Sequence, residues 1–295
     1  MPFCFFGAAP IFCRFPFVKT ITDAIFWYLE TFALISTTAI VASNSVIAPG
    51  ATLGANVRIG AFCVIDADVV IGEGSVIGSH SVINGHTHIG RHNVIGQFAS
   101  IGEINQDLKY RGEPTVVLIG DGNEIGKNTT IHRGTSQGAQ ITRIGNHNRL
   151  LCNVHIGHDC LLGNSILIGD NSGLAGHVVA GDFAQIGSMC AIHQFCVIGQ
   201  GAMIADQSGV VQDVPPYVCA SGNHAVPEGF NALALAFVNA NPPLRQILLS
   251  IYAKLFHDGV AIDEVKSEVL RLSAEYPLLH CFNEFFRLST RGIIR

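Results

Sequence analysis

Aliphatic residues recur at every sixth position along most of the chain. One run keeps this phase over 41–101, the phase returns over 119–131, and a second long run covers 144–210. A helix would need apolar residues at spacings of three and four, so a strict period of six favours a different structure. The pattern predicts short strands joined by tight turns, with one aliphatic side chain per strand pointing into a narrow prism of stacked coils.

Two segments interrupt the repeat, at 103–118 and 134–143. Loops that leave a rigid solenoid commonly carry the binding function. The first segment contains Gln106, Asp107 and Lys109, polar side chains suited to a phosphate or another charged partner. A solvated surface loop would have the same composition, so the residues alone leave both interpretations open.

The repeat ends at Val210, and a segment marked by proline and glycine follows it. Apolar residues at helical spacing then predict helices over 244–257, 262–276 and 278–288. We expect these helices to cap the end of the prism, where they would cover an open strand edge. The expected parts of the chain are an N-terminal extension (1–35), a β-helix domain (36–215) and a C-terminal helical domain (216–295).

The first 34 residues are rich in phenylalanine and lie outside the repeat. Prolines, Arg14, Asp23 and Glu30 interrupt their apolar stretches, which fall short of the roughly 20 clean apolar residues that a spanning helix needs. We therefore expect no stable membrane span here and assign this segment no function.

Composition narrows the class of protein. The formal net charge of −5 argues against nucleic acid as the main partner. Hydrophobic residues make up 48% of the chain and charged residues only 13%, which suits a protein whose surface is partly paired in an oligomer. The nine cysteines include no C-x-x-C pair, and a disulfide framework is not expected in a chain of this length, so a reducing cytoplasm is predicted.

Three histidines lie one repeat cycle apart. Ile156, Leu174 and Ile192 hold the same repeat position at intervals of 18 residues, and a histidine follows each of them within three residues. If three hexads make one coil, these segments stack about 4.8 Å apart on one face, and the imidazoles can line one cleft. A lone histidine is more often a structural hydrogen-bonding group, but three on one face favour a site. These histidines are His158, His177 and His193.

Several segments together resemble the UDP-N-acetylglucosamine O-acyltransferase family. The resemblance covers about 36–295 and implies a left-handed parallel β-helix that forms a homotrimer, with active sites between neighbouring prisms. The implied reaction starts lipid A synthesis: it moves a 3-hydroxyacyl chain from acyl carrier protein to the glucosamine 3-hydroxyl of UDP-N-acetylglucosamine, without a cofactor or metal ion. The matching segments include NGHTHIGRHNVIGQFASIGEINQDLKYRGEPT, TIHRGTSQGAQITRIG, NVHIGHDC, LAGHV, IHQF, QDVPPYV, GNHA and STRGIIR.

The resemblance assigns roles to individual residues. His158 is implied as the general base that takes the proton of the sugar hydroxyl, a task suited to an imidazole that titrates near neutrality. Asp159 would fix its tautomer, and the backbone N–H of Gly176 would stabilise the oxyanion. The substrate contacts implied by the family motifs are Gln106, Asp107, Lys109, His155, His177, His193, Gln194 and Asn231, with His224 near the acyl channel.

Two departures from the family pattern follow. Leu233, Phe237 and Val238 stand where the family carries one acidic and two basic residues, so charges that would hold uridine and donor phosphate are missing. Asp206 stands where the family has a small residue at the floor of the acyl channel. A buried, unpaired carboxylate would disfavour a long apolar tail, so we expect a preference for a shorter acyl chain.

Three alternative functions remain open from the sequence. A related hexapeptide acyltransferase, such as the N-acyltransferase of the same pathway, usually has a separate N-terminal uridine-binding domain, for which the extension has no room. A γ-type carbonic anhydrase would use histidines such as His155 and His193 to bind zinc. A binding trimer without turnover would agree with the apolar residues at Leu233 and Phe237.

Overall fold

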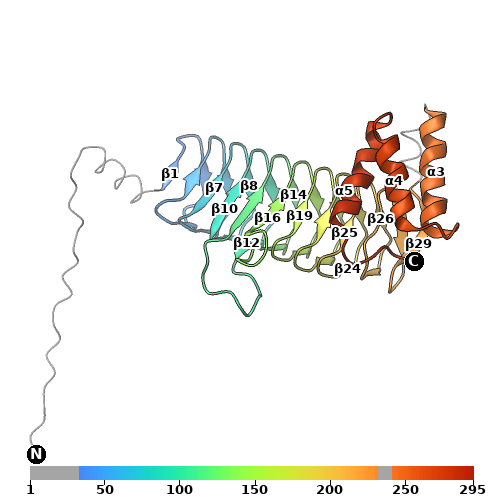
Figure 1. The fold of residues 1–295 in the computed structure, drawn as a ribbon. Coiled ribbons are helices and arrows are strands. Elements are labelled where there is room, and N and C mark those ends of the chain that lie inside the picture. The colour runs from blue at the N-terminus through green and yellow to red at the C-terminus, as the bar shows by residue number, and fades with distance from the viewer. Residues whose placement is uncertain (1–32, 232–240) are drawn as a thin grey trace, which may run out of the picture.

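The computed structural model describes residues 33–231 and 241–295. The chain forms a long prism of short strands, and three helices gather near its C-terminal end (Figure 1). The N-terminal extension up to residue 32 and the substituted positions Leu233, Phe237 and Val238 lie outside the described residues.

The strands form three sheets, one on each side of the prism, and up to β27 every third strand belongs to the same sheet. Sheet A contains β1 (Leu34–Ile35), β4 (Thr52–Leu53), β7 (Val69–Ile71), β10 (His86–Ile89), β13 (Val116–Ile119), β16 (Ile141–Ile144), β19 (Leu161–Leu162), β22 (Val179–Ala180) and β25 (Val197–Ile198). Sheet B contains β2 (Ile40–Val41), β5 (Arg58–Ile59), β8 (Val76–Ile77), β11 (Val94–Ile95), β14 (Glu124–Ile125), β17 (Arg149–Leu150), β20 (Leu167–Ile168), β23 (Gln185–Ile186), β26 (Met203–Ile204), β28 (Val218–Ser221) and β29 (Val226–Phe230). Sheet C contains β3 (Val46–Ile47), β6 (Val64–Ile65), β9 (Val82–Ile83), β12 (Ser100–Glu103), β15 (Thr130–His132), β18 (His155–Ile156), β21 (Gly173–Leu174), β24 (Ala191–Ile192) and β27 (Gly209–Val210).

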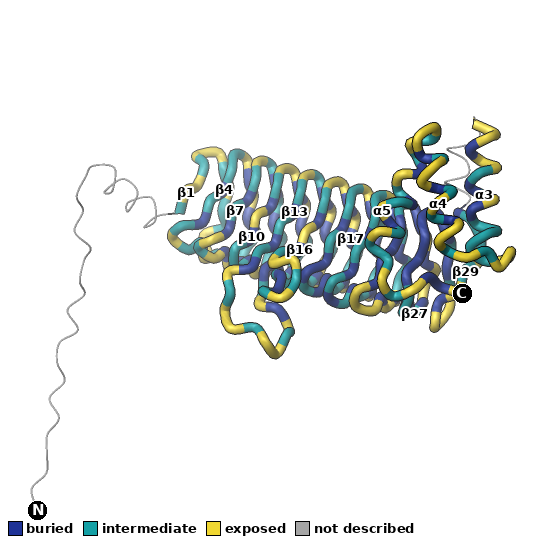
Figure 2. The backbone as a smooth tube through the Cα atoms, in the orientation of Figure 1, coloured by how far each residue is buried: buried dark blue, intermediate teal, exposed yellow. Residues whose placement is uncertain are grey.

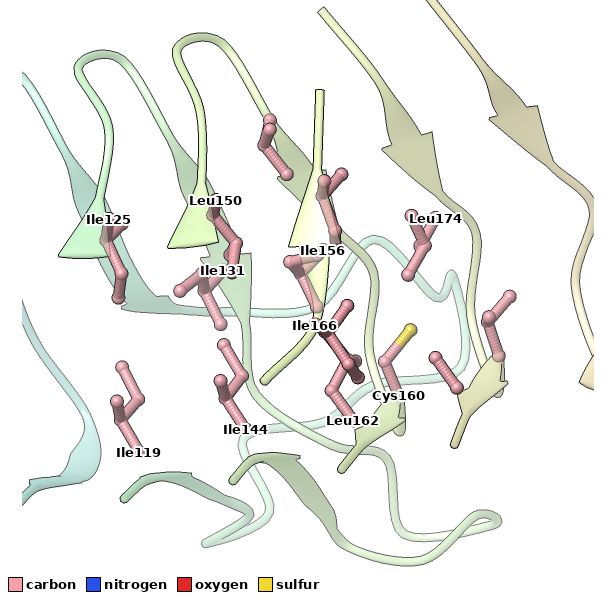
Figure 3. Packing of buried hydrophobic residues seen from close by; sticks show 14 of the residues in the cluster. Ile119, Ile125, Ile131, Ile144, Leu150, Ile156, Cys160, Leu162, Ile166 and Leu174 are labelled. Atoms are coloured by element: carbon pink, nitrogen blue, oxygen red, sulfur yellow. The ribbon is translucent and has the colours of Figure 1, made fainter. Parts of the chain in front are cut away.

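The repeat positions point into the prism, as the period of six predicts. Ile156 pairs in parallel register with Leu174, and Leu174 pairs with Ile192, so the three segments stack on one face. All three side chains are at most 2% exposed. Figure 3 shows aliphatic side chains from successive coils filling the interior. Burial of this continuous apolar column holds the coils together, because no single coil can cover its own apolar side.

The ends of the β-helix differ from the expected boundaries. The first coil begins at β1, so Leu34 and Ile35 belong to the prism rather than to the extension. Beyond 215, β28 continues sheet B in parallel with β26, and β29 then adds an antiparallel strand. The repeat is interrupted at 104–115 and 133–140, as predicted, and the longer loop projects from the prism and is mostly exposed (Figure 2).

The C-terminal helices form where their spacing predicts. They are α3 (Pro242–Phe256), α4 (Ile262–Leu272), the 3-10 turn η1 (Pro277–Leu279) and α5 (His280–Leu288). Asn241 caps α3 because its side chain accepts a hydrogen bond from the N–H of Leu244. The helix expected to reach residue 276 ends at Leu272, and Pro277 starts η1. Among the described residues, no helix is long and apolar enough to cross a membrane.

Asp213 ties the C-terminal tail to the last coils. It is fully buried, and its carboxylate accepts hydrogen bonds from the N–H of Val197 (2.8 Å), the hydroxyl of Ser289 (2.7 Å) and the N–H of Arg291 (3.0 Å). Its own backbone N–H donates to the carbonyl of Gly292 at 2.8 Å. One carboxylate therefore joins segments that are about 80 residues apart in the sequence.

The variant Asp213→Ala should lower the free energy of unfolding by about 3 kcal/mol, because buried donors would lose a charged acceptor. Urea unfolding followed by circular dichroism measures the change. Asp258→Ala, at an exposed position after α3, is the control and should stay within about 0.5 kcal/mol of the parent. Equal unfolding midpoints for Asp213→Ala and the parent would show that this carboxylate does not stabilise the fold.

Candidate active site

A cleft lies on the outer face of sheet C, where small residues replace larger ones on consecutive coils. The cleft has a volume of ≈ 340 Å³, and its small lining residues are Gly157, Gly173, Ala175, Gly176 and Ala191. The polar groups around it are His155, His158 and Gln106. Because the small residues leave space beside the histidines, the cleft can admit a polar ligand such as a sugar.

The corner that follows this sheet repeats one turn geometry on three coils. Asp159, His177 and Phe195 occupy equivalent positions with φ of 58°, 64° and 66°. The N–H of His177 donates to the carbonyl of His158 at 2.9 Å, and the ring of Phe195 stacks on the ring of His177 with centroids 4.4 Å apart. The left-handed turn brings the three side chains into one column, and the aromatic stack holds His177 in place.

His158 and Asp159 form a hydrogen-bonded pair at the head of this column. The Nδ1 atom of His158 lies 2.9 Å from Oδ2 of Asp159. A carboxylate only accepts hydrogen bonds, so Nδ1 carries a proton, and in the neutral form of the ring Nε2 is then the nitrogen that can accept one. Within the described residues Nε2 has no hydrogen-bond partner, and the half-buried ring borders the cleft. This is the arrangement of a general base held by a carboxylate.

Asp159 is held by the second interruption of the repeat. The hydroxyl of Thr135 donates to its Oδ2 at 2.7 Å and the N–H of Thr135 at 3.0 Å, while the backbone N–H of Asp159 donates to Thr142 Oγ1 at 2.9 Å. Burial opposes ionisation of this carboxyl, but the hydrogen bonds from His158 and Thr135 outweigh it and hold its pKa below the ordinary value. Asp159 is therefore ionised at neutral pH, opposite the ring that it orients.

Gly176 lies directly beside the free nitrogen of His158. A Cβ atom added at Gly176 would lie 2.5 Å from Cε1 and 2.6 Å from Nε2 of that ring, so a larger residue would push the imidazole aside. The carbonyl of Gly176 accepts from the N–H of Phe195, whereas its own N–H has no acceptor among the described residues. Gly176 therefore packs against the His158 ring and carries a backbone N–H without an acceptor among the described residues.

The same column is the set of described groups that could hold a metal ion. One ligand atom from each of His158, Asp159 and His177 lies within 4.8 Å of the others. Oδ2 of Asp159 already accepts hydrogen bonds from both His158 and Thr135, and a metal ion would displace these protons. These hydrogen bonds fit acid–base chemistry. A zinc ion would instead need ligand atoms that carry no proton and are not already engaged in hydrogen bonds.

Several residues expected at the site lie in or beside the cleft. His155 and Gln106 line it, and the ring of His177 contacts that of His158 edge-on, with centroids 5.0 Å apart. Asp107 acts electrostatically on His177. Nδ1 of His155 is hydrogen-bonded to Thr130 Oγ1 at 2.8 Å, which fixes the orientation of that ring.

Other predicted residues lie away from the cleft lining of this chain. His193 and Gln194 are exposed on the next coil, and Lys109 is exposed in the loop. The backbone N–H of Lys109 donates to Asp107 Oδ1. Asn231 is buried and donates through Nδ2 to the carbonyl of Gly201 at 2.9 Å, so its amide is engaged within the chain. His224 is exposed in the turn between β28 and β29.

Asp206, which is expected at the floor of the acyl channel, lies at the outer surface of the single chain. Asp206 is exposed, and its Oδ1 accepts a hydrogen bond from the N–H of Ser188 at 2.7 Å. The side chain caps a turn of the preceding coil, because the prism places residue 206 one coil after residue 188. Any contact between this carboxylate and an acyl chain would occur at the outer surface of the prism.

The sequence did not point to the threonines of the site. Thr130 and Thr135 lie 25 and 24 residues before the residues they contact, not 18, because the second interruption lengthens this coil. Phe195 and His132 were also missed, although the first continues the column of His177 and the second packs against His155 with ring centroids 5.2 Å apart. Extending the coil register across the interruption would have placed Thr130 opposite His155.

The two neighbouring histidines give the stability of the chain a pH dependence. Burial lowers the pKa of His155, and His132 and His158 lower it further. Burial also lowers the pKa of His177, although Asp159 opposes this. As the pH falls below the ordinary value of 6.5, the unfolded chain binds protons before the folded one does, so the folded state loses stability.

We therefore expect the free energy of unfolding to fall between pH 8 and pH 5.5. The loss should be smaller in the variant His155→Gln/His177→Gln, because these two sites then bind no proton in either state. Urea unfolding at both pH values measures the difference. An equal loss in the variant and the parent would assign the pH dependence to other groups.

Comparisons with known proteins agree with this geometry. The family model described as "Udp N-acetylglucosamine O-acyltransferase; Domain 2" matches residues 213–294, and the bacterial transferase hexapeptide model matches residues 68–103. These matches cover the C-terminal part of the chain and part of the repeat.

Solved structures match nearly the whole described chain. The chain is similar to LpxA from Acinetobacter baumannii, with 39% identity, coverage of 89% of this chain and 100% of the other, and a TM-score of 0.78. It is also similar to UDP-N-acetylglucosamine O-acyltransferase from Moraxella catarrhalis (39% identity, 89% and 98% coverage, TM-score 0.70). The UDP-N-acetylglucosamine acyltransferase of Francisella novicida gives 35% identity, 89% and 94% coverage and a TM-score of 0.74.

The predicted fold class, a left-handed parallel β-helix with a C-terminal helical domain, is confirmed by these structures and by the three parallel sheets. The identities exceed 30% over most of the chain, and no observation favours the carbonic anhydrase or the N-acyltransferase. The chain belongs to the UDP-N-acetylglucosamine O-acyltransferase family.

Proposed function

We propose that this chain transfers a 3-hydroxyacyl group from acyl carrier protein to the glucosamine 3-hydroxyl of UDP-N-acetylglucosamine, with His158 as general base. Nε2 takes the hydroxyl proton while the sugar oxygen forms a bond to the thioester carbonyl carbon. The C–S bond then breaks, and the carrier thiol leaves with the proton returned by the imidazolium. The products are the O-acylated sugar nucleotide and the free thiol.

The observation that carries this proposal is the position of His158 between two groups. Asp159 Oδ2 lies 2.9 Å from Nδ1, and a Cβ atom added at Gly176 would lie 2.6 Å from Nε2, so Gly176 packs against that side of the ring. The carboxylate stabilises the imidazolium that forms when the sugar hydroxyl is deprotonated. The Gly176 N–H is then available for the oxygen that gains negative charge as the thioester is attacked.

The nearby thiol supports direct transfer to the sugar. Cys160 follows Asp159 but is fully buried, and its Sγ donates to the carbonyl of Ala175 at 3.1 Å. Burial raises the pKa of this thiol to about 12, so it is protonated and a poor nucleophile at neutral pH. The sugar oxygen therefore attacks the donor thioester without an acyl-cysteine intermediate.

We assign the remaining polar residues to the substrates. Gln106 and His155 at the cleft bind the sugar nucleotide, and Asp107 and His177 orient the sugar beside the base. Lys109 contributes a positive charge to a phosphate, as a point charge on a flexible side chain. His193, Gln194, Asn231 and His224 complete the donor and nucleotide contacts where copies of the chain meet.

We propose a homotrimer whose subunits meet along sheet C and its corner. Val46, Val64 and Val82 are 60%, 42% and 36% exposed on successive strands of this sheet, and Phe62 and Phe98 are 57% and 51% exposed at the adjoining corner. An exposed apolar surface that runs along several coils favours a protein contact. Light scattering on the purified chain should give about three times the mass of 31.4 kDa, and a monomer would contradict this assembly.

We place the reaction in the cytoplasm, where acyl carrier protein and sugar nucleotides occur. Cys63, Cys160 and Cys190 support a reducing environment, because each Sγ donates a hydrogen bond to a backbone carbonyl at 3.1 Å as a free thiol.

A transfer assay tests the function directly. The purified chain is mixed with UDP-N-acetylglucosamine and a panel of 3-hydroxyacyl carrier proteins, and the acylated sugar nucleotide is detected by mass spectrometry. Product with at least one donor is expected. Binding of both substrates without product would instead favour the non-catalytic trimer.

The variant Asp206→Gly should shift the donor preference toward longer acyl chains by about tenfold for two added methylene groups, since each buried methylene contributes about 0.8 kcal/mol. The reason is that a carboxylate at the channel floor disfavours an apolar tail. The ratio of kcat/KM for donors of different length measures the shift. Asp182→Gly is the matched control, because Asp182 caps the N–H of Asn164 at 2.7 Å in the same way at another corner. An unchanged preference in Asp206→Gly would remove Asp206 from the channel.

A further inference from the structure

His132 joins the projecting loop to the floor of the cleft. It lies on β15 two residues after Thr130, so both side chains point out of the prism while Ile131 between them is fully buried. Its Nδ1 lies 2.7 Å from the carbonyl oxygen of Ile104, the first residue of the loop. A carbonyl only accepts, so Nδ1 of His132 carries the proton and donates.

The same ring supports His155. The two ring centroids are 5.2 Å apart in an edge-on arrangement, and Nδ1 of His155 shares a hydrogen bond of 2.8 Å with Thr130 Oγ1. β15 therefore fixes His155 through two outward residues of one strand. Because His155 lines the cleft, the orientation of His132 affects both a wall of the cleft and the loop above it.

The loop residues next to Ile104 are those that reach the cleft. Asn105 is buried and donates through Nδ2 to the carbonyl of Gly134 at 2.9 Å, which gives the loop base a second anchor. Gln106 then lines the cleft, and Asp107 acts on His177. The rest of the loop has few packing contacts, as the 93% exposure of Leu108 shows. The conformation of this segment therefore depends on the anchors at Ile104 and Asn105.

We infer that His132 is a positioning residue that fixes Gln106 at the cleft by holding the carbonyl of Ile104, and that orients His155 through the contact between the two rings. Only the expected effect of His132 on binding of the sugar nucleotide rests on the proposed function. The anchoring of the loop is a property of the chain without substrate.

Three substitutions separate the hydrogen bond from the ring contact. His132→Asn keeps a donor near the position of Nδ1, His132→Gln moves the donor toward the position of Nε2, and His132→Phe keeps a ring without a donor. His147→Phe is the matched control, because His147 is exposed at a corner between sheets A and B, where other corners of the prism carry phenylalanine.

The first measurement is amide hydrogen exchange over 104–110 in the substrate-free protein. Exchange should be about tenfold faster in His132→Phe and His132→Gln and close to the parent in His132→Asn and in the control, since one hydrogen bond is worth about that factor. The inference is overturned if His132→Phe exchanges like the parent, or if His132→Asn is as fast as His132→Phe. This result does not depend on the reaction.

The second measurement separates binding from chemistry. In the transfer assay KM for UDP-N-acetylglucosamine should rise about tenfold in His132→Phe while kcat falls less than threefold, and His132→Asn should restore KM. A fall in kcat at unchanged KM would contradict a positioning role. If the parent gave no product, the proposed function would fail, and the exchange result would still decide whether His132 anchors the loop.

Discussion

Replacing His158 by alanine should lower kcat for acyl transfer by about 10²–10⁴, the usual contribution of a general base. Without the imidazole, the hydrogen-bonded pair of His158 and Asp159 can no longer take the proton of the sugar hydroxyl. KM for the sugar nucleotide should change little, because Gln106 and His155 remain in the cleft. Steady-state kinetics with a saturating acyl donor measures both parameters.

His147→Ala is the control for this experiment. It removes an exposed imidazole from another corner of the prism and should leave kcat within twofold of the parent. Should His158→Ala turn over at the parent rate while its circular dichroism spectrum is unchanged, another residue must accept the proton.

The second large effect is expected for Asp159→Asn, which should lower kcat by about 10⁴ while leaving the fold intact. This magnitude is the one known for the corresponding change in a serine protease triad. An amide carries no negative charge, so it cannot compensate the charge of the imidazolium that forms during the reaction. The hydroxyl and N–H of Thr135 can still donate to the amide oxygen, so the side chain should keep its place.

Asp170→Asn is the matched control, because Asp170 accepts a hydrogen bond from the N–H of Cys152 at 2.9 Å in another turn. It should retain activity within twofold of the parent. Equal rates for Asp159→Asn and the parent would mean that the carboxylate neither fixes the tautomer nor stabilises the charged ring.

The prism could be predicted in detail because its packing repeats with the sequence. One aliphatic residue in six faces the interior, and a residue contacts its equivalent 18 positions later, so Ile156, Leu174 and Ile192 could be placed on one face before any coordinates existed. His177 lies 18 residues after Asp159, so the same register stacks it on that corner, next to His158. The helices were predictable for a similar reason, since Asn241 and Pro277 mark where helical segments begin.

The rest of the site depends on contacts that break this register. Thr135 reaches Asp159 over 24 residues and His132 reaches Ile104 over 28, because the two loops add residues between coils. His193 was grouped with His158 and His177, but it is exposed. The three histidines occupy different positions in the repeat: His193 follows Ile192 by one residue, whereas His177 follows Leu174 by three. The hydrogen bond of Asp206 was not predicted, because its partner is a backbone N–H, which side-chain types cannot reveal.

The geometry of the site does not depend on how many coils the prism contains. The groups around His158 come from the coils between β12 and β24, and each coil packs mainly against its neighbours. Adding or removing one whole turn of the prism near its N-terminal end would therefore leave the catalytic distances unchanged, whereas a change of a single residue between β18 and β24 would rotate every later side chain out of register. Evolution can vary the size of such a scaffold in steps of one coil and keep the same reaction centre.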